Sequence, residues 1–267
     1  MGIKLVISDV DGTLLTSAGT VSVANRQEIA RIIAAGVHFS VASGRPSSQI
    51  RPKLADIEAT TAIISSNGAV VEDLVTGEIL LDSHLERSLA RQVCMVTSDF
   101  DISHMLLDTA HGWSCRAGTG RRADETEELI RRLGATRIED WSSYFASEPQ
   151  IRKLIVYGKE PELGRLESAL GPTKGIQVTS SWLGNREIIV AGMDKAAAAR
   201  RLTEHLGFDP SEVLAVGDNR NDIELIGWAG IGVAMENAIP ELKQIADWIT
   251  TTNDDDGIAH ALAHFVR

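Results

Sequence analysis

The feature that most constrains this chain is a short apolar stretch at residues 3–8 that runs directly into Asp9-Val10-Asp11-Gly12-Thr13. A continuous apolar run between polar turn residues is typical of a strand buried on both faces of a parallel sheet. Such sheets carry their functional groups in the loops that follow the carboxyl ends of the strands. We therefore expect a central strand at residues 3–8 and a functional loop that begins at Asp9.

Strand and helix patterns alternate on both sides of a less regular middle section. Near the start of the chain, a helix capped by Ser22 precedes strands at residues 37–42 and 61–65. Near its end, a helix at residues 195–206 precedes a strand at residues 213–216. Alternating strands and helices form right-handed crossovers, so both halves are expected to share one doubly wound parallel sheet of the α/β, Rossmann-like class.

The middle section mixes strand patterns, such as residues 102–107 and 151–157, with helical ones in no regular order. This mixture predicts an inserted α+β module. We place the insert at residues 83–186, between core segments at residues 1–82 and 187–267.

Composition excludes several classes of protein. The 267 residues, 43% of them hydrophobic and 24% charged, are typical of a globular chain. The net charge of −11 opposes non-specific binding of nucleic acid.

No export signal and no run of 18 apolar residues is visible, so we expect no membrane partner and a cytoplasmic location. Cys94 and Cys115 fit buried thiols in a reducing compartment. The oligomeric state is expected to be a monomer or a homodimer.

The two aspartates at the end of the first strand can aim at one point, where one attacks and the other moves a proton. Gly12 permits the sharp turn that this arrangement needs. The structural alternative is an Asp-Gly hairpin turn, which is common. The motifs that follow favour the functional interpretation.

A second acidic motif, Gly217-Asp218-Asn219-Arg220-Asn221-Asp222, follows the predicted strand at residues 213–216. Carboxyl ends of parallel strands face the same edge of a sheet, so its aspartates are expected to converge on those of the first motif. Four carboxylates in one place require a cation, and all-oxygen ligands with a phosphate-bearing substrate favour Mg²⁺. The spacing does not match a calcium-binding loop. An ordinary acidic loop is the alternative.

Two further groups are candidates for binding a phosphoryl oxygen. Ser43 and Gly44 follow a predicted strand, where a hydroxyl group and loop amides can bind an anion. Lys195 opens an alanine-rich helix, the electrostatically unfavourable end for a lysine. A solvated lysine is the structural alternative. Val41 and Arg45 flank Ser43 where a serine-hydrolase elbow requires glycines, which disfavours acyl chemistry.

In order and spacing, these motifs resemble the four motifs of haloacid dehalogenase-like phosphatases. Further segments are similar to the type IIB, Cof-type sugar-phosphatase branch: Ser66-Asn67-Gly68-Ala69, Glu187-Ile188-Ile189, Met235-Glu236-Asn237-Ala238 and the stretch at residues 252–257. The resemblance covers nearly the whole chain. One departure is Ala196, where the family usually has glycine after the lysine.

The resemblance implies a magnesium-dependent phosphatase that acts on a small phosphate ester through an aspartyl-phosphate. It implies Asp9 as the nucleophile and Asp11 as the general acid and base. The implied substrate contacts are Val10, Ser43, Gly44, Arg45, Lys195 and Asn221. The implied Mg²⁺ site comprises Asp9, Asp11 through its backbone carbonyl, Asp218, and Asp222 as the residue that orients the others.

In this family the insert is a cap that closes over the site and selects the leaving group. Candidates for specificity contacts in it are His111, Trp113, Arg116, Arg121 and Arg122. Two other functions stay open. A phospho-acceptor signalling module would share the aspartate, hydroxyl, lysine and Mg²⁺, but it has no use for a proton shuttle at Asp11. A phosphomutase of the same superfamily would pass the phosphoryl group to a second hydroxyl group.

Overall fold

The computed structural model describes residues 2–57, 60–118, 123–181 and 183–266. The chain divides into two units, a core of Met1–Asp82 with Met193–Arg267 and an insert of Ser83–Gly192. The insert ends six residues later than the sequence indicated. The predicted boundary at Arg186 falls inside strand β11 (Asn185–Val190), which pairs with β9 and β10 of the insert, so the chain returns to the core only after this strand.

One eight-stranded sheet forms the centre of the core, in the order β14-β13-β12-β1-β2-β3-β4-β5. β1 lies between β12 and β2 and is parallel to both, which confirms the predicted central strand and the sheet shared by both ends of the chain. The strands are β1 (Leu5–Asp9), β2 (His38–Ala42), β3 (Ala62–Ser65), β4 (Val70–Asp73), β5 (Ile79–Asp82), β12 (Val213–Gly217), β13 (Ile231–Ala234) and β14 (Trp248–Ile249).

The predicted doubly wound parallel sheet is confirmed, and one edge adds a hairpin in which β4 runs antiparallel to both β3 and β5. The cause is the length of the connection. Only residues 66–69 link β3 to β4, whereas a parallel crossover needs a dozen or more residues.

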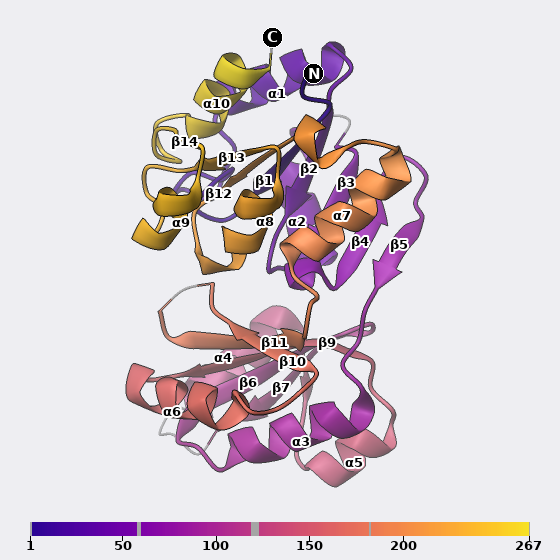
Figure 1. The fold of residues 1–267 in the computed structure, drawn as a ribbon. Helices are drawn as coiled ribbons and strands as arrows, with labels where there is room; N and C mark the ends of the chain where they lie inside the picture. The colour runs from indigo at the N-terminus through magenta and orange to yellow at the C-terminus, as the bar shows by residue number, and fades with distance from the viewer. Residues whose placement is uncertain (1, 58–59, 119–122, 182, 267) are drawn as a thin grey trace. The chain divides into compact units, whose positions relative to one another are not determined.

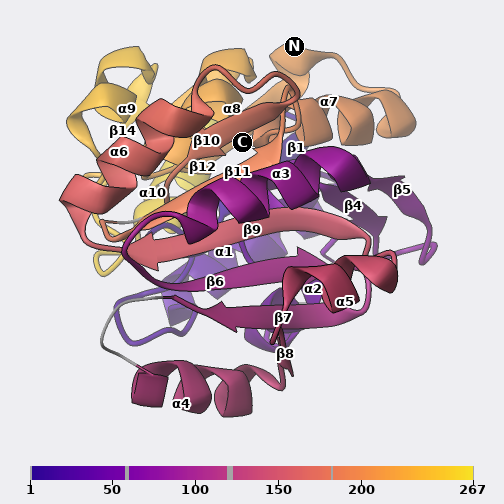
Figure 2. The same cartoon turned by 90° about the horizontal axis from the view of Figure 1, so that it is seen from below.

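Helices cover both faces of the core sheet (Figures 1 and 2). On one face lie α7 (Lys195–Leu206), α8 (Ile223–Trp228) and α9 (Pro240–Ile245); on the other lie α1 (Val23–Ala34), α2 (Ser47–Ile50) and α10 (Gly257–Phe265), with α10 packed on α1. Short 3₁₀ turns occur at η1 (Arg51–Leu54), η2 (Ser66–Gly68), η3 (Pro210–Glu212) and η4 (Arg220–Asp222).

Local sequence explains the better-predicted elements. The hydroxyl oxygen of Ser22 accepts a hydrogen bond from the backbone N–H of Asn25 and so caps α1, as expected. Ile29 and Ile32 lie on the buried face of that helix. All five residues of β1 are buried, as the continuous apolar run required. The helix predicted at residues 195–206 coincides with α7.

The insert contains a six-stranded sheet in the order β10-β11-β9-β6-β7-β8, antiparallel except between β7 and β8. Its remaining strands are β6 (Ile102–Thr109), β7 (Gly112–Ala117), β8 (Thr136–Arg137), β9 (Ile151–Gly158) and β10 (Ile176–Thr179). Its helices are α3 (Arg87–Ser98), α4 (Ala123–Leu133), α5 (Trp141–Ala146) and α6 (Glu160–Leu170). The main apolar cluster joins this sheet to α3, α5 and α6, and a smaller cluster lies beside α4.

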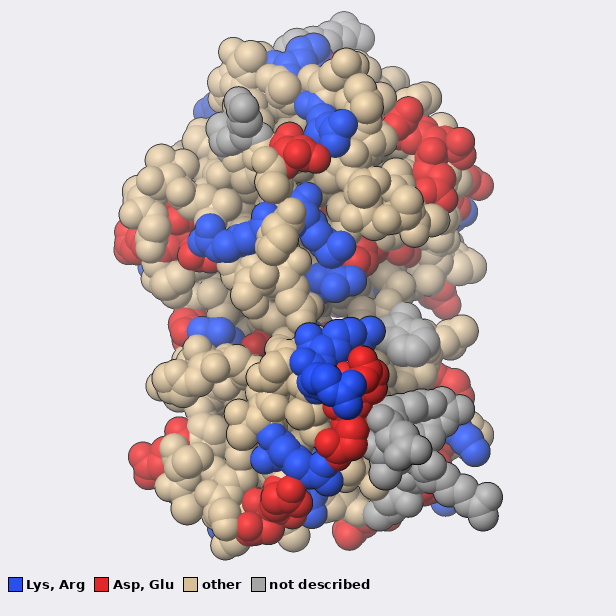
Figure 3. All heavy atoms as spheres, turned by 180° about the vertical axis from the view of Figure 1, so that it is seen from behind, with Lys and Arg blue, Asp and Glu red and all other residues tan. Residues whose placement is uncertain are grey.

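The burial of the cysteines and the distribution of surface charge can be compared with the sequence predictions. Both Cys94 and Cys115 are buried, as predicted. On the face shown in Figure 3, basic side chains occur in small groups with acidic ones nearby. Among the described residues, no helix has both the length and the apolar character needed to cross a bilayer.

We expect Leu166→Ala to destabilise the insert by about 2–5 kcal/mol, the usual range for such a truncation in a packed core. Leu166 of α6 is fully buried in the main cluster of the insert, and the core sheet has a separate cluster. Hydrogen exchange should therefore rise in α3, α6 and β9, with little change in β1 and β12. Leu183→Ala, at an 80% exposed side chain, is the control. Equal deprotection of both units would contradict the prediction.

Candidate active site

Asp9 is the last residue of β1 and is 5% exposed. The loop after it turns at Gly12, which has a φ of +82°. A Cβ atom at Gly12 would lie only 2.5 Å from Oδ2 of Asp218, so both the backbone angle and the close approach require glycine there. The loop therefore brings the first motif directly against the second.

Three carboxylates meet at this point. Oxygen atoms of Asp9, Asp218 and Asp222 lie within 4.8 Å of one another. The Nζ of Lys195 donates hydrogen bonds to Oδ1 of Asp9 at 2.5 Å and to Oδ1 of Asp222 at 2.6 Å. The structure thus brings together the predicted nucleophile, the predicted phosphoryl-binding lysine and two aspartates of the second motif.

Asp222 holds this arrangement in place. Its Oδ2 accepts the backbone N–H groups of Asp218 and Asn219, while its Oδ1 accepts from Lys195. Gly217 allows the loop to fold back so closely, because a Cβ atom there would lie 2.6 Å from that of Asp222. Both oxygens of Asp222 bind protein donors, so this residue orients Lys195 and the loop that carries Asp218. Asp218 instead accepts a hydrogen bond from Thr13 Oγ1 at 2.9 Å.

Burial dominates the electrostatics of the cluster. It raises the pKa of Asp9 well above the ordinary value, and the nearby carboxylates add to the rise despite the opposing effect of Lys195. Burial and the charge of Asp222 raise the pKa of Asp218 to about 6. Burial by itself would lower the pKa of Lys195, but Asp222 and Asp9 outweigh it and the pKa is raised. One ammonium group therefore does not neutralise three carboxylates.

The residues present fit a hard divalent cation. The three clustered side chains supply only oxygen ligands. Burial, with the charges of neighbouring carboxylates, raises the pKa values of Asp9 and Asp218, so a cation bound there would favour their charged forms. Small, hard ions such as Mg²⁺ bind one or two carboxylates together with water and substrate phosphates. Asp9 and Asp218 are the members that could serve as ligands, because Asp222 is committed to protein donors.

Asp11 lies beside this cluster rather than in it. Its carboxylate is 46% exposed and forms a bidentate ion pair with Arg45, whose Nε and Nη2 donate at 2.6 and 2.8 Å. Ser43 is buried after β2, and its Oγ accepts the backbone N–H of Arg45 at 3.1 Å. Val10 lies with its side chain in the apolar core, so it offers only backbone atoms to a ligand.

Sequence reasoning gave no role to several residues that shape the site. Asn67, after β3, accepts a hydrogen bond through Oδ1 from Nδ2 of Asn221 at 3.1 Å. Asn237 donates to the backbone carbonyl of Gly12 at 2.8 Å. The signal was present, since both stand in segments that resemble the type IIB branch, but a single sequence does not show which side chain reaches another loop.

The first loop is also tied to the end of the chain. Asn253 donates to the carbonyl oxygen of Leu15 at 2.9 Å. Asp254 accepts hydrogen bonds from the N–H and the hydroxyl group of Ser17 at 2.7 and 2.6 Å. These contacts, with that of Asn237, fix the path of the loop that follows Asp9.

The specificity candidates in the insert have different surroundings. Arg116 stacks over the ring of Trp141 and donates to the carbonyl oxygen of Glu139 at 2.6 Å, so it packs within the insert. Trp113 packs on the smaller apolar cluster, and His111 is exposed in a turn. Arg121 and Arg122 lie outside the described residues.

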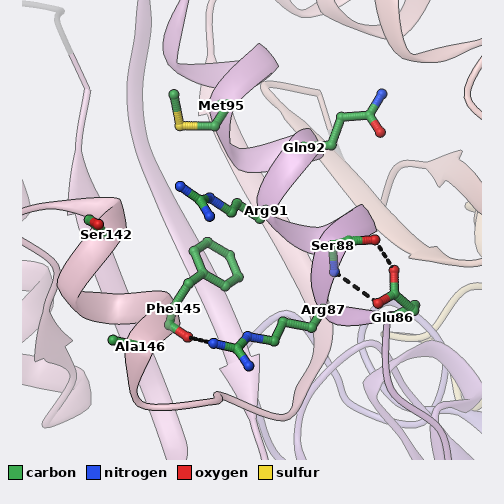
Figure 4. Close-up of a pocket in the computed structure, with 9 residues that line it drawn as sticks. All are labelled: Glu86, Arg87, Ser88, Arg91, Gln92, Met95, Ser142, Phe145 and Ala146. Atoms are coloured by element: carbon green, nitrogen blue, oxygen red, sulfur yellow. Dashed lines mark hydrogen bonds between the residues drawn. The ribbon is translucent and has the colours of Figure 1, made fainter.

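The insert also has a pocket of about 650 Å³ between α3 and α5 (Figure 4). Two of its polar residues make local contacts: Glu86 caps α3, and Arg87 donates to the carbonyl oxygen of Phe145. Its lining residues are Glu86, Arg87, Ser88, Arg91, Gln92, Met95, Ser142, Phe145 and Ala146. None of them belongs to the motifs described above.

Comparison with known proteins gives the family. The family profile of the haloacid dehalogenase-like hydrolases matches residues 6–262. The 5-amino-6-(5-phospho-D-ribitylamino)uracil phosphatase YcsE of Bacillus subtilis is 29% identical over 270 residues, which cover 99% of this chain and 96% of that protein. The solved structure of the phosphatase BT1666 from Bacteroides thetaiotaomicron is 25% identical, covers 99% of this chain and 95% of its own, and has a TM-score of 0.84.

The chain therefore belongs to the haloacid dehalogenase-like hydrolases and is an enzyme of that family, as its motifs predicted. Its fold is that of the type IIB branch. The structure of the HAD subclass IIB sugar phosphatase BT4131 superposes with a TM-score of 0.84 at 20% identity and covers 98% of each chain.

We expect Asp218→Asn to stabilise the metal-free protein at pH 7.5 by up to about 3 kcal/mol. The folded-state pKa of about 6 exceeds that of a free aspartate by about two units, and each unit is worth about 1.4 kcal/mol. The cost of ionising Asp218 is complete above pH 6 and disappears below about pH 4, so the gain should vanish as the pH falls. Urea unfolding in chelator at several pH values measures this gain.

Asp254→Asn is the matched control. Hydrogen bonds from Ser17 lower the pKa of Asp254, so this substitution should reduce stability at neutral pH rather than raise it. With saturating Mg²⁺, the wild type should gain stability and Asp218→Asn should gain less. A pH-independent effect of Asp218→Asn would show that its charge is not penalised in the folded state.

Proposed function

We propose that the chain is a magnesium-dependent phosphatase that hydrolyses a small phosphorylated metabolite, a sugar phosphate or similar phosphomonoester, through an aspartyl-phosphate on Asp9. The observation that carries the proposal is the buried Asp9 carboxylate, held at the end of β1 by Lys195 and surrounded by two further aspartates. Family membership and the curated relatives named as phosphatases support hydrolysis of a phosphate ester.

In the proposed reaction, Asp9 attacks phosphorus. Lys195 binds Oδ1 of Asp9, which leaves Oδ2 as the attacking atom. In the first step, the bond between Asp9 Oδ2 and phosphorus forms while the bond to the leaving oxygen breaks. In the second step, water attacks phosphorus and Asp9 is released with inorganic phosphate. Phosphoryl transfer of this kind depends mainly on positioning and on charge stabilisation.

Asp11 would move the protons. It gives one to the leaving alkoxide in the first step and takes one from the attacking water in the second. In the structure both carboxylate oxygens of Asp11 accept hydrogen bonds from Arg45, so one of these bonds must open when Asp11 carries a proton. We therefore propose that Arg45 holds Asp11 at the site between proton transfers, in addition to the substrate contact that the family resemblance implies.

Other residues would bind the transferring group and the cation. Ser43, the backbone of Gly44, Lys195 and Asn221 are the proposed contacts of the phosphoryl oxygens. Asp9, Asp218 and the backbone carbonyl of Asp11 are the proposed ligands of Mg²⁺, with Asp222 orienting them. When bound, the ion offsets the negative charge of the carboxylates and of the phosphoryl oxygens.

The insert is proposed to act as the cap that selects the leaving group. Two names support a polyol or sugar phosphate as the substrate class: the relative YcsE is a phosphatase of a phosphoribitylamino-uracil, and BT4131 is a sugar phosphatase. The cytoplasmic location and the monomeric or homodimeric state stay predictions.

Phosphate release from an aryl phosphate and a panel of sugar phosphates, with Mg²⁺ or with chelator, tests the proposal. We expect metal-dependent release from the wild type. Asp9→Asn should abolish turnover because the nucleophile is lost, and Asp11→Asn should lower kcat by about 10²–10⁴-fold because the proton shuttle is lost. The mass of the wild type, quenched during turnover, should increase by one phosphoryl group on Asp9.

Asp209→Asn serves as a control because Asp209 is exposed, caps η3 and makes no contact with the proposed reacting groups. Near-full activity of Asp9→Asn would refute the aspartyl-phosphate mechanism. Isomerised sugar phosphate without free phosphate would instead favour a phosphomutase.

A further inference from the structure

The turn that links β3 to β4 has an unusual backbone. Ser66, Asn67 and Gly68 have φ values of +54°, +56° and +95°, so three successive residues adopt left-handed conformations. Residues other than glycine rarely do so, and such conformations persist only where the surroundings enforce them. Asparagine tolerates this region better than most residues. Contacts of this turn with its surroundings must therefore hold it in this conformation.

The backbone of the turn binds the loop after β2. The N–H of Ser66 donates to the carbonyl oxygen of Arg45, and the N–H of Asn67 donates to that of Ser43, each at 3.0 Å. The turn therefore fixes both ends of the segment that contains the proposed phosphoryl contacts Ser43 and Gly44.

The same turn reaches two other parts of the site. A Cβ atom on Gly68 would lie 2.2 Å from the carbonyl oxygen of Asp194, so the turn packs against the residue just before Lys195. The side chain of Asn67 is 2% exposed and accepts the hydrogen bond from Nδ2 of Asn221. One strained turn thus contacts the segments that carry Ser43, Lys195 and Asn221.

We propose that Asn67 is a positioning residue that sets the geometry of the phosphoryl-binding groups. Its amide oxygen orients the side chain of Asn221, and its backbone N–H holds the carbonyl of Ser43. Asparagine suits both tasks, because it adopts a positive φ and also offers a carbonyl oxygen on its side chain. The identity of the bound group rests on the proposed function, whereas the positioning of the loops does not.

Asn67→Gly separates the side chain from the backbone, because glycine adopts the same φ without strain. We expect this variant to fold with undiminished thermal stability and to lose about 10–100-fold in kcat for phosphate release, with a smaller change in KM, since misplaced contacts mainly affect the transition state. Asp256→Gly is the matched control. It replaces a polar residue with a φ of +58° that makes no side-chain capping bond at the start of α10.

A double-mutant cycle with Asn221→Ala tests the proposed route. If Asn67 acts through Asn221, the double variant should be little worse than the more damaged single variant. Independent losses that multiply would mean that Asn67 does not act through Asn221, and would overturn the proposal.

Hydrogen exchange supplies a readout that needs no activity. In Asn67→Gly, backbone amides at residues 217–222 should exchange faster than in the wild type, because the side-chain bond to Asn221 is lost. Amides at residues 43–45 should not change, because glycine keeps the backbone N–H that holds the Ser43 carbonyl. Asp256→Gly should leave the exchange at residues 217–222 unchanged. Unchanged exchange together with unchanged kcat would overturn the inference. If the wild type releases no phosphate with Mg²⁺, the proposed function fails, and the exchange data still decide whether Asn67 positions these loops.

Discussion

The buried ammonium group of Lys195, shared between Asp9 and Asp222, is the interaction on which the site depends. A charged side chain this deeply buried is stable only when it is paired and hydrogen-bonded. Its partner Asp9 is the last residue of β1, and its partner Asp222 lies in the loop after β12. Lys195 itself is the first residue of α7. Removal of the ammonium would leave two adjacent carboxylates in a desolvated place. The pairing therefore couples the sheet, the helix and the reactive carboxylate.

Sequence patterns predicted the parts of the fold that depend on local chemistry. The apolar run of β1, the cap at Ser22 and the start of α7 at Lys195 all have nearby causes. The antiparallel hairpin of β4 and β5 was missed, because strand direction depends on the length of a connection rather than on the residues within a strand. The end of the insert differs from the prediction because β11 pairs with β10 and β9 of the insert, and the sequence of a strand does not show which sheet it joins.

For the candidate site, the sequence predicted which residues lie together but not how their side chains contact one another. Strand ends on one edge of a parallel sheet converge, so the meeting of Asp9 with Asp218 and Asp222 followed from topology. The ion pair of Asp11 with Arg45 and the amide contact of Asn67 did not follow, because they depend on side-chain reach between loops. The order of the motifs shows which residues gather at the edge of the core sheet. The contacts between their side chains can be seen only in the three-dimensional structure.

The loop that follows Asp9 has a dependence that bears on how the protein is made. Its path is fixed by Asn237, Asn253 and Asp254, and the bond from Ser17 to Asp254 spans 237 positions of the chain. Asp9 is therefore made long before the groups that shape its loop. Because domains fold as units during synthesis, the nascent chain carries this carboxylate before its surroundings exist. The loop can take its final path only once residues 237–254 have been made.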